Sequence, residues 1–313
     1  MASQLAGLPI AMLGCDAREV GLAEALVDLG VDLHLVGFPR RGTLKRALHF
    51  DDPREAVLGA RAVIAPMSNT DAAGWIRAGV DSTETAINLA EVIPVIPSKT
   101  PLLIGVAKPL IRGLATQYGL VLIEMAEIEE VAVLNSIPTA EGAIYVAMEN
   151  TSITIHGSRS LVLGLGRCGT TLTQSLVALG ADVTVAARSG EDLARAVALH
   201  CQALPLAALK SRTDFQIIFN TIPAMVLPRS YLRLLDPSAV IIDIASSPGG
   251  TDFAAAQELG ISAIHALSLP GKVAPKTAAE ILIQTIPHHL ARLLGEEHHH
   301  DYEREKHRLC PNG

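Results

Sequence analysis

Six residues in the second half of the chain have the spacing of a dinucleotide-binding turn. Gly164-Leu165-Gly166-Arg167-Cys168-Gly169 stands between the apolar run 161–163 and the amphipathic stretch 170–179, so this G-x-G-x-x-G pattern joins a strand to a helix. In such a turn Gly164 permits a tight bend, Gly166 lets the backbone approach a diphosphate, and Gly169 lets the helix pack on the strand. We therefore expect this turn, including Arg167 and Cys168, to bind a dinucleotide at a helix N-terminus.

The end of the next strand indicates which dinucleotide binds. NAD enzymes carry a carboxylate there for the ribose 2′-hydroxyl, whereas a cation accommodates the 2′-phosphate of NADP. The sequence has Ala187-Arg188-Ser189 at this point, without a carboxylate. Arg188 and the Ser189 hydroxyl can bind a phosphate, with Arg167 adding charge, so we expect NADP rather than NAD. As the alternative, Arg188 is a solvated surface residue.

Two further strand ends carry small or polar residues. Asn220-Thr221-Ile222-Pro223 follows one apolar strand, and Asp243 ends the next, before the small-residue segment 244–252. We expect Asn220, Thr221, Pro223 and Asp243 to lie against the cofactor. Asp252 has a second interpretation as the N-cap of a helix.

Two predicted helix starts could bind the substrate, because helix N-termini attract anions. One helix is expected from Pro138 and the other from Pro275. Lys276 is expected to bind a substrate carboxylate, and Glu141 or His156 to accept a proton. The alternatives are a first-turn carboxylate for Glu141 and a structural role for His156. The further substrate-binding candidates are Thr139, Gly271 and Thr277.

Composition limits the classes of protein. The chain has 313 residues, of which 49% are hydrophobic and 18% charged, so it should form about two globular domains. A net charge of −7 argues against a nucleic-acid binder. Four cysteines without a C-x-x-C pair suggest neither a disulfide framework nor a zinc site, and indicate reducing cytosol. No signal peptide, membrane-spanning helix or metal site is expected.

The elements that position these residues follow an α/β pattern. Apolar runs at 9–13, 32–36, 62–67, 102–107 and 121–125 predict the strands of a first sheet. Runs at 161–163, 182–186, 216–220, 240–244 and 262–266 predict those of a second sheet. We expect two doubly wound parallel-sheet domains: an N-terminal flavodoxin-like substrate domain and a C-terminal Rossmann domain.

The domains are expected at 1–137 and 153–274. Helices at 138–152 and 275–295 are expected to bridge them, with a ligand cleft at the carboxyl ends of the strands. The remaining segment, 296–313, is expected to be a frayed polar tail. It holds His298, His299 and His300, whose side chains point in different directions and are not expected to form a complete metal site.

Two of these motifs resemble known enzymes. PTAEG at 138–142 and PGKVAPKTA at 270–278 are similar to motifs of the methylenetetrahydrofolate dehydrogenase/cyclohydrolases, and the two-domain plan resembles shikimate dehydrogenases. However, the N-terminal domain lacks the tyrosine–x–x–x–lysine pair of the cyclohydrolases. The asparagine–threonine–aspartate of the shikimate dehydrogenases is also missing at 138–142.

A closer resemblance covers residues 1–295. Eight motifs, in order, are similar to those of the A subunit of dipicolinate synthase from endospore-forming bacteria: GCDAR at 14–18, NSIPTAEG at 135–142, TIHGS at 154–158, GLGR at 164–167, ARS at 187–189, NTIP at 220–223, PGGTDF at 248–253 and LPGKVAPKT at 269–277.

This resemblance implies oxidation of dihydrodipicolinate, a small dianionic heterocycle, to dipicolinate with NADP during sporulation. It implies that the partner is a flavoprotein-like B subunit and that the protein works in the mother-cell cytoplasm, and it leaves a homo-oligomer open. Two alternatives remain. One is an NADP dehydrogenase of the shikimate or folate type. The other is a non-catalytic NADP-binding scaffold for the flavoprotein.

Overall fold

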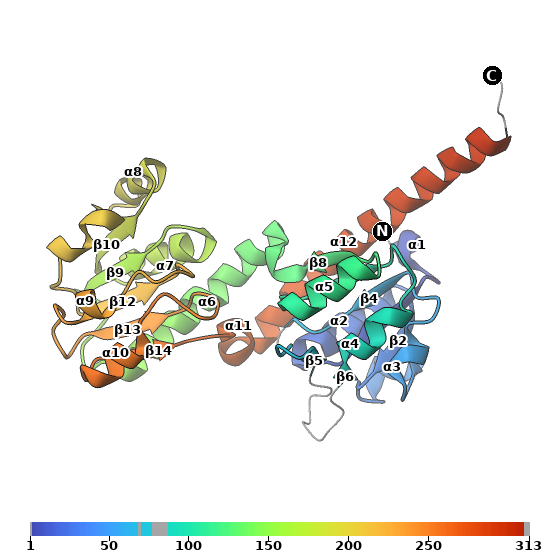
Figure 1. Ribbon diagram of the computed structural model, residues 1–313, viewed down its shortest axis with the longest axis horizontal. Coiled ribbons are helices and arrows are strands. Elements are labelled where there is room, and N and C mark those ends of the chain that lie inside the picture. The colour runs from blue at the N-terminus through green and yellow to red at the C-terminus, as the bar shows by residue number, and fades with distance from the viewer. Residues whose placement is uncertain (1, 68–69, 77–86, 310–313) are drawn as a thin grey trace. The chain divides into compact units, whose positions relative to one another are not determined.

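The computed structural model describes residues 2–67, 70–76 and 87–309, with side chains from 4–67, 70–76 and 87–295. The chain forms two compact units, each built on its own parallel sheet (Figure 1). The first unit combines Met1–Ala132 with Pro275–Gly313, and the second is Val133–Ala274. The C-terminal helix, expected as a bridging helix, is thus grouped with the first unit.

The first unit contains a six-stranded sheet in the order β3-β2-β1-β4-β7-β8. Without the two-residue edge strand β3, this is the flavodoxin-like order that the sequence predicted, and β3 extends it to the Rossmann order. The chain order reverses between β1 and β4, so the switch point lies there. The strands are β1 (Pro9–Leu13), β2 (Asp32–Val36), β3 (Leu48–His49), β4 (Ala62–Ile64), β7 (Pro101–Ile104) and β8 (Val121–Glu124).

Helices cover both faces of this sheet (Figure 1). On one face, Ala11, Val63 and Leu102 belong to a core shared with α3, α4 and α5. On the other, α2 packs against α12, and a Cβ at Gly21 would lie at van der Waals distance, 3.4 Å, from Ile283 Cδ1. The helices are α1 (Ala2–Leu5), α2 (Ala17–Asp28), α3 (Pro53–Ala56), α4 (Leu89–Val92), α5 (Pro109–Gln117) and α12 (Pro275–Leu309), with short 3₁₀ turns at Gly42–Arg46, Ile93–Val95 and Met125–Glu127.

The second unit repeats the six-strand order as β11-β10-β9-β12-β13-β14. Its switch point therefore lies between β9 and β12, where the glycine turn follows β9. The strands are β9 (Arg159–Leu163), β10 (Asp182–Ala187), β11 (Gln202–Pro205), β12 (Ile217–Asn220), β13 (Val240–Asp243) and β14 (Ser262–His265). The helices are α6 (Glu129–Asn150), whose residues 129–132 belong to the first unit, α7 (Arg167–Ala178), α8 (Gly190–Ala198), α9 (Arg229–Leu232), α10 (Phe253–Glu258) and α11 (Leu269–Val273), with a 3₁₀ turn at Leu206–Ser211.

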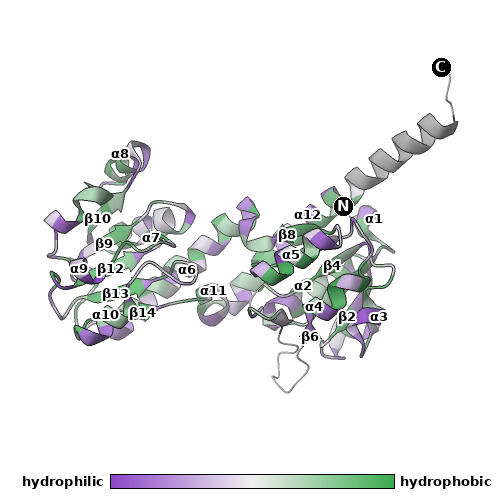
Figure 2. Ribbon diagram, viewed as in Figure 1, coloured by the Kyte–Doolittle hydropathy of each residue, from purple (hydrophilic) through white to green (hydrophobic). Residues whose placement is uncertain are grey.

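Alternating side chains of the second sheet enter two separate cores. Val162 of β9 packs with α6 and α7, whereas Leu161 and Leu163 pack with α9 and α10. Because these strands are buried on both faces, they appear in the sequence as continuous apolar runs, and this pattern allowed them to be predicted. Figure 2 shows the same strands as predominantly hydrophobic.

Two predicted boundaries were wrong. α6 begins at Glu129, and Pro138 lies inside it rather than at its first turn. The C-terminal helix continues to Leu309 instead of ending in a frayed tail at 296. A small antiparallel pair, β5 (Trp75–Ile76) with β6 (Ile87–Asn88), forms separately from the six-stranded sheet, and residues 77–86 lie outside the described residues.

By length and composition alone, α6 could span a membrane. Its Ala140, Ala143 and Ala147 are fully buried in the core of the second unit, however. A buried core helix passes the same test, so this apolarity is explained by packing.

Candidate functional sites

The glycine turn has the backbone geometry of a dinucleotide site. Gly164 adopts φ +89°, which favours glycine, and its N–H donates to Ala186 O at 2.9 Å. A Cβ at Gly169 would lie 2.2 Å from Gly164 O, so only glycine lets α7 start this close to β9. A Cβ at Gly166 would instead meet no heavy atom within 4 Å. The turn therefore leaves open space at the position where a diphosphate approaches the backbone.

Arg167 and Cys168 form the first residues of α7. Arg167 is exposed, whereas Cys168 is partly buried. Burial raises the pKa of the Cys168 thiol, although Arg167 acts in the opposite direction. Cys168 is therefore a neutral thiol at pH 7, and it can contribute packing at the turn but not a thiolate.

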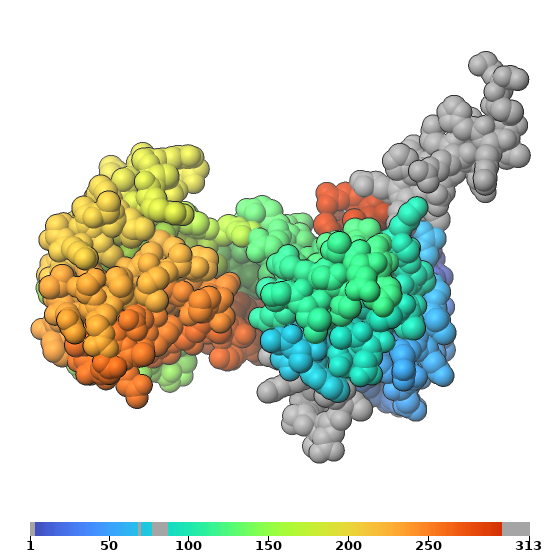
Figure 3. All heavy atoms as spheres, viewed as in Figure 1, coloured from blue at the N-terminus to red at the C-terminus, as the bar shows by residue number. Residues whose placement is uncertain are grey.

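The carboxyl end of β10 presents a cation and a hydroxyl. Arg188 and Ser189 are both exposed, and the chain around α8 lies at the surface of the second unit (Figure 3). Ser189 Oγ accepts the N–H of Asp192 at 3.0 Å as the N-cap of α8, which leaves its O–H as a donor. The carboxylates of Glu191 and Asp192 pair with Arg195. This arrangement suits a phosphate better than a pair of ribose hydroxyls.

The end of β12 lies against the glycine turn. Thr221 Oγ1 donates to Leu163 O at 2.8 Å, and a Cβ at Gly164 would lie 2.6 Å from that hydroxyl oxygen. Asn220 is fully buried, and its amide both donates to Ile222 O and accepts from Ile222 N at 3.0 Å. Pro223 follows as an exposed residue. Asn220 and Thr221 thus shape the turn, and Pro223 is the member of this motif that faces solvent.

Asp243 has a different role from the one expected. Its carboxylate is fully buried and accepts four hydrogen bonds at 2.7–3.1 Å. A carboxylate with its oxygens engaged in this way holds the loop 244–251 in place, so the prediction that Asp243 contacts the cofactor is corrected. Asp252 caps α10 by accepting from Ala255 N, which is the alternative that the sequence left open. The donors to Asp243 are Asn220 Nδ2, Ala245 N, Gly250 N and Thr251 Oγ1.

The predicted substrate residues of the second unit lie on α6 and α11. Thr139 Oγ1 donates to Asn135 O within the helix, and Glu141 is exposed. Both lie several residues inside α6, so the expected first-turn position of Glu141 is wrong. Gly142 brings the two helices close, because a Cβ there would lie 3.0 Å from Leu269 Cβ of α11. The two motifs that contain Thr139, Glu141 and Gly271 are therefore neighbours.

The other predicted residues lie elsewhere. His156 precedes β9 and contacts Leu179 O with Nδ1 at 3.2 Å, at the amino edge of the sheet. The glycine turn is at the carboxyl edge of the same strand, so this position argues against His156 as the base. Lys276 and Thr277 are exposed in the first turn of α12, in the first unit, and Lys276 Nζ lies 4.0 Å from Glu280. The side chains of the triple histidine lie outside the described residues.

Sequence reasoning missed a polar cluster in the first unit. Asp16, Arg18 and Glu19 follow β1 at the switch point, and Arg18 and Glu19 are buried. Asp16 and Glu19 form a capping box at the start of α2, and the spacing D-x-x-E before an apolar run is the signal that could have identified it.

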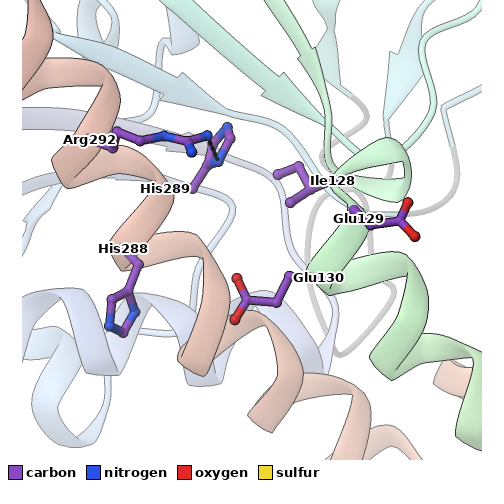
Figure 4. Close-up of a pocket in the computed structure, with 6 residues that line it drawn as sticks. All are labelled: Ile128, Glu129, Glu130, His288, His289 and Arg292. Carbon is purple, nitrogen blue, oxygen red and sulfur yellow. Dashed lines mark hydrogen bonds between the residues drawn. The ribbon is translucent and has the colours of Figure 1, made fainter.

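A pocket of about 420 Å³ lies beside α12. In Figure 4, Glu130 at the start of α6 extends toward α12, while Glu129 points away. Arg292 Nη2 donates to His289 Nδ1 at 3.3 Å, and burial together with Arg292 lowers the pKa of His289. Among the described residues, no group of three ligating side chains could hold a metal ion. The residues that line the pocket include none from the loop after β1 or from the glycine turn, and their charges are mixed, so it is a weaker candidate than either switch point.

Comparisons with known proteins place the chain in one family. The family model for the N-terminal domain of the dipicolinate synthase A subunit matches residues 9–126. The A subunit of dipicolinate synthase from Bacillus subtilis (strain 168) is 37% identical over 300 residues, which are 94% of this chain and 99% of the relative.

Solved structures give the same result. The crystal structure of the same subunit from Bacillus subtilis has a TM-score of 0.86 at 36% identity, covering 93% of this chain and 98% of that one. The structure of the A subunit from Bacillus halodurans has the same TM-score at 32% identity, covering 92% and 99%. A transhydrogenase from Sinorhizobium meliloti shares the fold alone, with a TM-score of 0.64 at 14% identity over 91% and 94%. The chain belongs to the family of dipicolinate synthase A subunits.

Proposed function

We propose that this chain is an NADP-dependent oxidoreductase that oxidises dihydrodipicolinate to dipicolinate, as its family implies. The observation that carries the proposal is the glycine turn at the switch point between β9 and β12. There a Cβ would be blocked at Gly164 and Gly169 but would project into open space at Gly166. This is the pattern of a turn that binds a diphosphate through its backbone.

The C-terminal unit holds the cofactor in this proposal. The amides of the glycine turn and the start of α7 bind the diphosphate, and Arg188, Ser189 and Arg167 bind the 2′-phosphate. Thr221 and Pro223 border the same turn. When bound, NADP supplies the hydride acceptor of the reaction. The chain's own contribution is orientation and charge.

The substrate is a dianion, and its oxidation removes one hydride and one proton from the ring. We assign the proton to Glu141, an exposed residue of α6 that directly precedes Gly142, where α6 packs on α11. Thr139, Gly271 and Thr277 contact the ring, and Lys276 pairs with one of its carboxylates. The N-terminal unit is the substrate domain. The family name implies a second subunit, proposed to be flavoprotein-like, and the proposed location is the cytoplasm of the mother cell.

Cofactor choice is tested by titration. Arg188→Ala should weaken NADP by about 1–3 kcal/mol and leave NAD nearly unchanged, because a charge-assisted hydrogen bond to the 2′-phosphate is lost. Arg229→Ala is the matched control, since Arg229 is an arginine of α9 in the same unit, outside the proposed cofactor site, that pairs with Glu258. Equal losses of NADP and NAD affinity in the Arg188 variant would contradict the assignment.

Turnover tests the chemistry. Glu141→Gln should lower turnover by about 10²–10⁴-fold with little change in NADP affinity, because it removes the proton acceptor but retains the shape. His156→Ala is the control and should keep full activity. A chain that binds NADP tightly and shows no turnover alone, but supports turnover when its partner subunit is present, would favour the scaffold alternative. Turnover of shikimate or a folate instead of dihydrodipicolinate would reassign the substrate.

A further inference from the structure

The pocket of about 420 Å³ beside α12 has no part in the proposed reaction. It lies within the first unit, between the chain at the start of α6 and residues 288–292 of α12. Its volume is within the range of small-molecule sites, about 300–1,000 Å³. Ile128 and His289 are half-buried in its wall, whereas Glu130, His288 and Arg292 are exposed. A small ligand can therefore reach charged side chains and also lie against an apolar one.

Two opposite charges face this pocket without pairing. In Figure 4 Glu130 extends from the first turn of α6 toward α12, the helix that carries Arg292. Among the described residues, neither of these two side chains forms an ion pair, either with the other or with a third group. A carboxylate and a guanidinium that line one cavity but lie too far apart to pair can both be neutralised by a ligand with one charge of each sign.

The histidine next to Arg292 adds a hydrogen-bond donor to the positive side of the pocket. A guanidinium has only donors, so His289 Nδ1 accepts the bond from Arg292 at 3.3 Å, and the ring proton is on Nε2. Burial and the charge of Arg292 lower the pKa of His289, which keeps the ring neutral at pH 7. Arg292 and His289 therefore both present N–H groups that a carboxylate can accept.

The second histidine adds an acceptor to the negative side. His288 Nδ1 lies 2.8 Å from Gln284 O, which can only accept, so the proton of the neutral ring is on Nδ1 and the free acceptor is Nε2. Figure 4 shows Arg292 and His289 in the upper part of the view, and Glu130 and His288 in the lower part. The polar groups of the pocket are thus divided into a donor side and an acceptor side.

We propose that this pocket binds a free α-amino acid. The carboxylate of the ligand pairs with Arg292 and accepts the Nε2–H of His289. Its ammonium group donates to the Glu130 carboxylate and to His288 Nε2, and Ile128 provides an apolar contact. A dianion such as dipicolinate, or the phosphates of a dinucleotide, would be repelled by Glu130. The amino-acid site is therefore a second site, separate from the one proposed for the reaction.

The test starts with the full chain and the common L-amino acids, each added at up to about 10 mM and followed by saturation-transfer NMR of the ligand. At least one should bind, with a dissociation constant in the micromolar to millimolar range. That amino acid is then compared with two analogues, the carboxylic acid without the amino group and the amine without the carboxyl group. Each analogue should bind about tenfold more weakly or worse, because it leaves one charged group of the pocket without a partner.

Two variants connect binding to the pocket. Arg292→Gln and Glu130→Gln should each weaken binding by about tenfold or more, because each removes a charge-assisted hydrogen bond. In addition, Arg292→Gln should bind the amino acid no better than the amine, and Glu130→Gln should bind it no better than the carboxylic acid. Arg46→Gln is the matched control and should keep the wild-type affinity, since Arg46 is an exposed arginine of the same unit that pairs with Asp28 and does not line the pocket.

The proposal is overturned if no common amino acid binds, if the analogues bind as well as the amino acid, or if both variants keep the wild-type affinity. Displacement of the amino acid by NADP would place it in the cofactor site and would also overturn the proposal. If a second copy of the chain covers the pocket instead, no amino acid binds and Arg292→Gln lowers the molecular mass measured by analytical ultracentrifugation. The comparison of analogues needs only the wild-type chain, so it decides the question even where a variant does not fold. No measurement uses turnover, so the result is independent of the proposed function.

Discussion

Replacing Asp243 by asparagine tests how the loop after β13 is held. The Asp243 carboxylate is fully buried, with Ala245 N and Asn220 Nδ2 on Oδ1 and Gly250 N and Thr251 Oγ1 on Oδ2. The asparagine side chain of the variant can keep the first two bonds through its oxygen but presents an NH₂ group to the other two donors. The Thr251 hydroxyl can rotate to accept, whereas the Gly250 N–H has no such option.

The expected cost follows from these contacts. One hydrogen bond to a charged acceptor is lost, at about 1.5–3 kcal/mol, the bond with Thr251 becomes a weaker neutral one, and the buried Gly250 N–H is left without a partner, at about 1–3 kcal/mol. The lower desolvation cost of a neutral amide offsets part of this. We therefore expect Asp243→Asn to destabilise the second unit by about 3–5 kcal/mol.

Urea unfolding followed by circular dichroism measures this loss, with NADP titration as a second readout of the loop. Asp182→Asn is the matched control, because Asp182 is exposed in the same sheet and its Oδ1 bond from Gln202 survives the change. The control should lie within about 0.5 kcal/mol of wild type. A loss below about 1 kcal/mol for Asp243→Asn would refute the view that this carboxylate holds the loop.

Three further results are expected. Gly166→Val should abolish dinucleotide binding, because the new side chain would occupy the open space that the diphosphate needs. The melting temperature should not fall, because a Cβ at Gly166 meets no atom of the fold. If calorimetry shows undiminished NADP affinity, the diphosphate binds elsewhere. Gly169→Ala should destabilise the fold itself, because its Cβ would lie 2.2 Å from Gly164 O, and a normal melting curve would contradict that close approach. The free energy of unfolding of the first unit should fall as pH rises from about 4.5 to 7, because burial raises the pKa of Glu19 to about 7, so that Glu19 keeps its proton in the folded state and releases it in the unfolded state. Urea unfolding at pH 5.5 and at pH 8 should show this loss of stability, and Glu19→Gln should reduce it.

Much of the fold could be predicted because its signals are local. A strand such as Val240–Asp243 is apolar on both faces, and the glycine turn combines a fixed spacing with a strand before it and a helix after it. The short edge strand Gln202–Pro205 was missed because it is mostly exposed and has no apolar run. Pro138 was misleading because proline favours the first turn of a helix, whereas here it lies inside α6.

The candidate site was harder to predict, because roles depend on partners distant in the sequence. Asp243 cannot be recognised as the anchor of a loop until Gly250 and Thr251 fold back onto it. The burial of Glu19 depends on Met67, which is 48 residues away. His156 was considered as the proton acceptor because strand direction was not taken into account, although a residue just before a strand must lie at the amino edge of the sheet.

The first unit is assembled from both ends of the chain, which has a consequence for how the protein is made. Synthesis runs from the N-terminus, so all of Val133–Ala274 emerges from the ribosome before α12 exists. The second unit can therefore fold while the first still lacks the helix that packs against Gly21 of α2. A nascent chain that stops before Pro275 carries the complete second unit and a first unit in which α2 is not yet covered by α12. Packing of α12 on α2 then closes a loop that contains the whole second unit.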